Sequence, residues 1–148
     1  MMLLIRAALF AALFACGHVA AAAFHSAQEN RAIGPLLALS DSDEESTTET
    51  GCTSTFYVAG IDYLQLVGTE LMLRDPHGLH ACRLTEAGTR AFDAGQNSIA
   101  CSQYRLQLRT IGRATAKAVS DSSSTKAVLT IDRGGIAATM RGRWGVAC

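Results

Sequence analysis

The cysteines are the residues whose chemistry is easiest to interpret in this 148-residue chain. Four of the five lie after residue 51, at Cys52, Cys82, Cys101 and Cys148. No two of them have the Cys-x-x-Cys spacing, so neither a zinc knuckle nor a thioredoxin-like redox centre is supported. We therefore predict structural disulfides at these positions and no metal site.

A second group of polar residues lies in the run Asp75-Pro76-His77-Gly78-Leu79-His80. Asp75, His77 and His80 are of the types that coordinate zinc, but no fourth ligand is evident. The Asp-Pro-x-Gly pattern is also typical of a turn, because proline presets φ and aspartate caps the turn. This run is therefore interpreted as a hairpin turn.

The sequence contains no catalytic or phosphate-binding motif that we recognise. The serine-rich run at 120–124 has no Gly-x-Ser-x-Gly elbow and is interpreted as a solvated hairpin loop. Arg133-Gly134-Gly135 lacks the lysine and the following helix of a phosphate loop. We therefore expect no catalytic residues, no enzyme activity and no cofactor.

The arginines are the best candidates for binding chemistry. Arg105, Arg109, Arg141 and Arg143 fall on the outward parity of two expected strands, and Arg113 and Lys117 could extend the same surface. Such a basic stripe suits phosphates or carboxylates. The alternative is that these charges provide solubility and protect strand edges. Nucleic acid is not favoured, because no aromatic platform interleaves the arginines.

The arginines are positioned by short segments with a period of two after residue 51. The clearest alternation is at 136–148, where Met140 and Trp144 share one parity and the two arginines share the other. The same pattern places Tyr104, Leu106 and Leu108 inward. The expected strands cover 53–59, 63–67, 70–74, 79–85, 104–110, 113–119, 126–132 and 136–148. Only 86–100 is long enough for a helical turn, around 90–94.

Seven or eight short strands with tight turns predict an all-β domain, namely a small antiparallel β-barrel or a two-sheet sandwich, stapled by disulfides. We prefer the barrel, because closure removes open strand edges. In an up-and-down barrel the first and last strands are neighbours, which places Cys52 beside Cys148 and leaves Cys82 with Cys101. The sequential pairing, Cys52 with Cys82 and Cys101 with Cys148, is the main alternative.

Residues 1–23 have the layout of a secretory signal peptide, with Arg6 followed by an apolar run and then by small residues. Leu13-Phe14-Ala15-Cys16 resembles the lipobox of bacterial lipoproteins, which predicts a lipid on Cys16. Ordinary cleavage around 19–23 is the alternative and would discard that cysteine. The sequence has no second apolar stretch that is long enough to span a membrane.

Charge divides the rest of the chain into two parts. Residues 24–50 carry six acids against one arginine, a net charge of −5, and are interpreted as an acidic disordered linker. Residues 51–148 carry eleven Lys and Arg against seven acids, a net charge of +4, and are interpreted as the β domain. The zero net charge of the chain therefore hides an asymmetry.

Together these features predict an exported, non-catalytic envelope protein, either a bacterial lipoprotein or a periplasmic or secreted protein. Its β domain would bind an envelope protein or an anionic envelope polymer through the basic outer face, with a membrane tether if Cys16 is lipidated. The alternatives are an assembly factor that holds a lipid or a partner strand, or an inhibitor of an extracellular lysozyme or protease. A small hydrolase is the least favoured.

Overall fold

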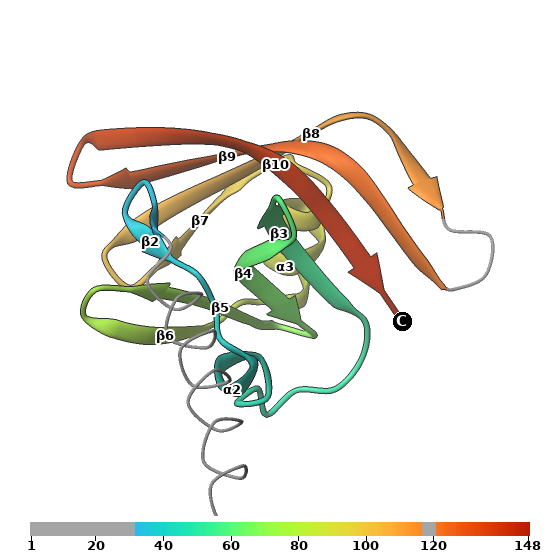
Figure 1. The fold of residues 1–148 in the computed structure, drawn as a ribbon, viewed down its shortest axis with the longest axis horizontal. Helices are drawn as coiled ribbons and strands as arrows, with labels where there is room; N and C mark the ends of the chain where they lie inside the picture. Colours follow the sequence, from blue (N-terminus) through green and yellow to red (C-terminus); the bar gives the residue numbers. More distant parts are fainter. Residues whose placement is uncertain (1–31, 117–120) are drawn as a thin grey trace, which may run out of the picture.

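The computed structural model describes residues 32–116 and 121–148, so the expected leader with Cys16, and Lys117, lie outside the described residues. The described chain is all-β, with an antiparallel sheet curled into a half-barrel (Figure 1). Its elements, in chain order, are β1 (Ala32–Ile33), β2 (Leu36–Leu37), α2 (Asp41–Glu44), β3 (Thr53–Val58), β4 (Ile61–Val67), β5 (Glu70–Asp75), β6 (Gly78–Arg83), α3 (Glu86–Asp93), β7 (Ser98–Cys101), β8 (Tyr104–Ala116), β9 (Ser122–Arg133) and β10 (Ile136–Ala147).

The sheet consists of two antiparallel meanders that meet at β3 and β10. Strands β3 to β6 pair in sequence order, as do β7 to β10. The last strand, β10, pairs with β3, the first strand of the other meander, with Trp144 opposite Phe56. Connections of this kind are short because antiparallel neighbours need only a tight turn. The predicted small antiparallel barrel-like fold is therefore confirmed in its class and strand direction.

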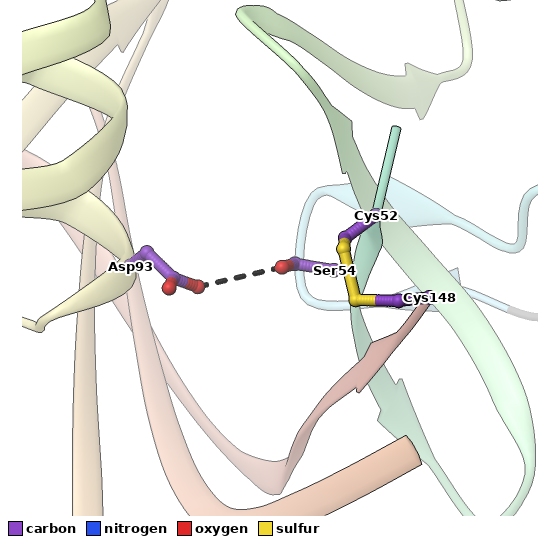
Figure 2. Close-up of a disulfide and its surroundings, with 4 residues drawn as sticks. All are labelled: Cys52, Ser54, Asp93 and Cys148. Carbon is purple, nitrogen blue, oxygen red and sulfur yellow. Dashed lines mark hydrogen bonds between the residues drawn. A yellow bond between two sulfur atoms is a disulfide. The ribbon is translucent and has the colours of Figure 1, made fainter. Parts of the chain in front are cut away.

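One disulfide joins the two meanders of the sheet, and the other joins two of its edge strands. Cys52–Cys148 joins the start of β3 to the end of β10, with Cα atoms 4.3 Å apart (Figure 2). Cys82–Cys101 joins β6 to β7, the two strands at opposite ends of the sheet, with Cα atoms 5.5 Å apart. An up-and-down arrangement of strands predicts this pairing, and the prediction is confirmed.

Closure of the barrel differs from the prediction. We expected hydrogen bonds to close the sheet completely, but no described residue of β6 pairs with β7 through a strand ladder. The connection between these strands contains α3, and β7 is only four residues long. The seam between the two edge strands is therefore spanned by the Cys82–Cys101 disulfide instead of by a ladder.

The core lies inside the curl of the sheet. Alternate residues of the long strands point inward and are fully buried, including Leu106, Leu108 and Leu129. The predicted helical turn is the helix α3, capped by the Thr85 hydroxyl, and its Phe92 packs edge-to-face on Trp144 with ring centroids 6.0 Å apart. The predicted parity of β10 is correct, although Ile136 is 80% exposed because it lies at the tip of the β9–β10 hairpin.

The end of α3 is fixed to the strands that carry the Cys52–Cys148 disulfide. The Ser54 hydroxyl donates to Asp93 Oδ1 at 3.4 Å (Figure 2). The indole Nε1 of Trp144 donates to the same oxygen at 2.6 Å. The two donors belong to buried residues, whose polar groups need a hydrogen-bond partner. One helix terminus thus connects β3 and β10 on the inner face of the sheet.

The acidic linker prediction is wrong for residues 36–50, which we call the strap. Leu36 and Ala38 are fully buried, and Leu39 donates its N–H to the Asp62 carbonyl at 2.8 Å. The strap forms β2 and α2 and pairs with β5 at Leu37 and Arg74. It folds onto the domain because its short apolar run is buried and because arginines of β5 and β6 form ion pairs with its acids.

Candidate anion-binding face

Charge is strongly segregated between strands β8–β10 and the rest of the described domain, most of whose net negative charge lies in the strap. Among the described residues from 104 onward, seven Lys and Arg face two acids, a net charge of +5. From residue 32 to residue 103, three arginines face ten acids, a net charge of −7. The asymmetry therefore separates β8–β10 from the rest of the domain, and it is larger than the division at residue 51 indicates.

The strand register brings three of the four predicted arginines together. Arg109 of β8 and Arg141 of β10 are both opposite Val128 of the intervening strand, so their backbones are roughly 10 Å apart. Arg143 is opposite Lys126. We call these four cations, Arg109, Lys126, Arg141 and Arg143, the basic face. Lys126 was not among the candidates, because a single strand pattern does not show which residues meet across a sheet.

The other candidates lie outside this cluster. Arg105 is four residues from Arg109 along β8, roughly 13 Å away. It is paired in the strand register with Asp132, which carries the opposite charge. Arg113 is exposed at a bulge, where the β8–β9 register shifts between Ile111 and Thr115. Sequence parity therefore gave the outward direction of these arginines but not their grouping.

The cations of β8–β10 differ from the other arginines in their partners. Arg74, Arg83 and Arg90 each form an ion pair with an acid, whereas no ion pair of the described residues involves a cation of β8, β9 or β10. Arg143 is held by a neutral group, donating from Nη2 to the Ser124 hydroxyl at 2.7 Å. The basic face therefore carries positive charge that no described carboxylate neutralises.

The Asp75 run forms the predicted hairpin turn between β5 and β6. Asp75 accepts a hydrogen bond from the His77 N–H at 2.7 Å and another from the Tyr104 hydroxyl at 2.8 Å, while His80 Nε2 lies 3.0 Å from its carboxylate. Burial alone would raise the pKa of Asp75, but these partners outweigh it and hold the pKa well below its ordinary value. The carboxylate is thus a structural acceptor that links the turn to β8.

An open groove of about 330 Å³ lies beside the basic face. Most of its lining surface is apolar, but seven of its twelve lining residues carry a side-chain hydroxyl, and these lie on β3, at the end of β8 and at the start of β9. The lining residues are Thr53, Thr55, Tyr57, Gly60, Asp62, Thr115, Ser122, Ser123, Ser124, Gly145, Val146 and Ala147. The predicted serine loop is wrong from Ser122 onward, because β9 begins there and its serines line the groove.

The Tyr57 ring forms part of the groove because Gly145 leaves room for it. A Cβ atom at Gly145 would lie 3.0 Å from Tyr57 Cε1, closer than almost any real contact of that kind. The ring therefore lies against the strand where a side chain of β10 would otherwise stand. Tyr57 is half-buried, and its place on the outer parity of its strand gives no sign in the sequence of a binding role.

A pair of carboxyl groups borders the groove where the strap meets β4. Glu44 of α2 hydrogen-bonds to Asp62, which lines the groove. Burial, together with the negative charges of Asp62, Asp41 and Asp43, raises the pKa of Glu44 to about 7. Burial also raises the pKa of Asp62, and the hydrogen bond from Glu44 partly offsets this effect. Below about pH 7 the Glu44 carboxyl of the folded domain therefore binds a proton.

This pair predicts that the domain loses stability as the pH rises from about 4.5 to about 7. In that range Glu44 is ionised in the unfolded chain, where its pKa is near 4.5, but protonated in the folded domain. The folded state thus binds more protons, and the free energy of unfolding falls by about 1–2 kcal/mol after allowance for partial exposure. Urea titrations at intervals across this range would measure the fall.

Glu44→Gln is the matched control for this prediction. The amide keeps a donor for Asp62 but does not titrate, so the decrease in stability between pH 4.5 and 7 should shrink to less than half. An unchanged decrease in the variant would show that other groups cause it.

Comparisons with protein-family models, with curated proteins and with solved structures found no match to this chain. Within residues 32–116 and 121–148, no helix is both long and apolar enough to cross a membrane. In the same residues, no group of three or more His, Cys, Asp or Glu side chains is arranged to hold a metal ion. The function is therefore inferred from the geometry alone.

Proposed function

We propose that this chain is an exported, non-catalytic binding protein whose β domain recognises an anionic partner through the basic face. The observation that carries this proposal is the cluster of Arg109, Lys126, Arg141 and Arg143, which lies on one outer surface and forms no ion pair with an acid in residues 32–116 and 121–148. Guanidinium groups are always charged and bind carboxylates and phosphates through paired hydrogen bonds. A partner that carries either group would neutralise this surface.

Two further features support an envelope location. The disulfides Cys52–Cys148 and Cys82–Cys101 are compatible with an oxidising compartment. Residues 1–23 supply the export pattern, and a lipid on Cys16 would anchor the protein at the outer membrane, whereas ordinary cleavage would release it into the periplasm or the medium. The partner is then an envelope protein or an anionic envelope polymer.

The interior of the sheet favours surface recognition over the alternative of an assembly factor that holds a lipid inside. Phe92 of α3 is fully buried within the curl and packs on Trp144, so side chains fill the space that a lipid would need. An inhibitor of an extracellular lysozyme or protease is a special case of the proposed function, in which the anionic partner is a protein.

The proposal predicts that Arg109→Gln combined with Arg141→Gln weakens binding to immobilised polyglutamate and polyphosphate by at least about tenfold. Surface plasmon resonance at about 50 mM and 300 mM salt would measure this, and binding of the unmodified domain should weaken at the higher salt, because surface charges are then screened.

Arg83→Gln combined with Arg90→Gln is the matched control. It removes the same charge from side chains that are 65% and 73% exposed and lie outside the basic face. Binding should change by less than about twofold. Equal losses in the two double variants would mean that net charge, and not this surface, attracts the anion, and the proposed function would then fail.

A further inference from the structure

We propose that the groove beside the basic face is a subsite for a sugar ring, so that the anionic partner is an acidic glycan. This inference rests on the proposed function and names the class of its ligand. The groove and the basic face lie on the same outer surface, because Arg143 of the basic face is opposite Tyr57 of the groove in the β10–β3 register. One extended ligand can therefore contact both.

The lining of the groove is suited to a neutral, polyhydroxylated group. Threonine, serine and tyrosine hydroxyls each both donate and accept hydrogen bonds, as sugar hydroxyls do. None of the lining residues is Lys or Arg, so the groove itself offers no charge to an anion. Its volume of about 330 Å³ is at the small end of ligand sites, which suits one or two sugar rings.

Tyr57 supplies the apolar contact that a sugar ring requires. One face of a pyranose presents C–H groups, which pack against an aromatic ring, while the phenol hydroxyl stays available to polar groups. Gly145 leaves room for the ring, since a Cβ atom there would lie 3.0 Å from Tyr57 Cε1 and the ring would have to shift by a few tenths of an ångström. This close approach gives a reason for glycine in a strand where other residues would favour the extended backbone.

The two ends of the groove differ in charge, and this difference favours one orientation of a bound ligand. The carboxyl of Asp62 at one end accepts hydrogen bonds from sugar hydroxyls but repels an acidic substituent. At the other end Ser124 lines the groove and holds the guanidinium of Arg143, with Lys126 opposite it on the neighbouring strand. An acidic substituent of the bound ring would thus point toward the basic face.

The test compares three small ligands by isothermal titration calorimetry: a linear tetramer of galacturonic acid, the matching tetramer of galactose and tetraglutamate. The galacturonate tetramer should bind at least about tenfold more tightly than either of the others. Tyr57→Leu should weaken galacturonate binding about tenfold and change tetraglutamate binding by less than about twofold. Tyr57→Phe keeps the ring and should retain most of the affinity.

The outcomes separate this inference from the proposed function. If tetraglutamate binds as well as galacturonate and Tyr57→Leu changes neither, the sugar subsite is wrong while the basic face stands. If the galactose tetramer binds as tightly as the acidic one, the ligand class is wrong. If no anion binds, including polyphosphate, the proposed function itself fails. Should Tyr57→Leu not fold, Thr53→Ala with Thr55→Ala is the second variant, with an expected loss of about fivefold in galacturonate binding and none in tetraglutamate binding.

Discussion

Replacement of both Cys52 and Cys148 by serine is expected to lower the free energy of unfolding by about 4–5 kcal/mol. The bond links residues that are 96 positions apart, so it encloses almost the whole β domain. A cross-link of this span removes much of the conformational freedom of the unfolded chain, and this entropy returns when the bond is removed. Urea unfolding followed by far-UV circular dichroism would measure the loss.

The folded structure itself should survive this replacement. The ladder between β3 and β10 and the hydrogen bonds that Asp93 accepts from Trp144 and Ser54 hold the same two strands. The Ser54 bond is drawn in Figure 2. We therefore expect the near-UV spectrum of Trp144 to be unchanged in the absence of urea. A changed spectrum would show that the disulfide acts on the native state as well.

Cys82→Ser combined with Cys101→Ser is the matched comparison, with a smaller expected loss of about 3 kcal/mol. Its bond spans only 19 residues, so it constrains the unfolded chain less. A larger loss here than for the Cys52–Cys148 pair would contradict this ranking. It would mean that the seam between β6 and β7 depends on its cross-link for native stability, since no ladder of the described residues joins these strands.

Strand parity explains why most of the fold could be predicted. Successive side chains of a strand point to opposite faces, so the alternation at 136–148 placed Met140 and Trp144 inside and Arg141 outside without any tertiary information. The disulfide pairing followed from the adjacency of first and last strands. Both inferences use only the local period of two and the order of the strands.

The strap could not be predicted in the same way, because its stabilising partners are distant in sequence. Its acids were counted as free charges, but Asp43 pairs with Arg74 and Glu49 pairs with Arg83. The apolar run at 32–39 is compatible in sequence with a turn of helix or a docking patch, but composition does not show that residues 36–39 are almost entirely buried. The rule that acidic segments are disordered fails where arginines elsewhere in the chain offset the charge.

The candidate site was predictable in part for a related reason. Parity showed that the arginines face outward, but grouping them requires the register between strands, which depends on the bulge of β8 and on both hairpins. The groove requires, in addition, the close approach of Tyr57 to Gly145. Neither feature has a local pattern in the sequence.

Asp43→Ala is expected to lower the free energy of unfolding by about 3–5 kcal/mol, because the substitution removes a buried carboxylate to which the half-buried Arg74 donates two hydrogen bonds. Asp43 is 4% exposed, and Arg74 donates to both of its carboxylate oxygens. The same carboxylate accepts from the Ser40 N–H at 2.9 Å and so completes the capping box of α2. Both the ion pair and the cap would be lost.

The pH dependence of this contribution has a definite sign. Burial alone would raise the pKa of Asp43, but the hydrogen bonds from Arg74 and Ser40 outweigh it and lower the pKa below the ordinary 3.8. The stabilisation is therefore complete above that value and is lost as the pH falls through the folded pKa. Asp43→Asn keeps a capping oxygen and should recover part of the loss, which separates the cap from the ion pair.

Glu45→Ala is the control for Asp43→Ala, since it removes an exposed acid that adjoins the same helical turn, and it should change stability by less than about 0.5 kcal/mol. If both alanine variants had equal and small effects on stability, residues 36–50 would be a disordered linker and not a folded strap. A large effect confined to Asp43 would make the strap part of the folded domain. The attached strap would then also hold Glu44 beside Asp62. The border of the proposed sugar subsite would thus depend on the Asp43–Arg74 ion pair, which lies outside the groove.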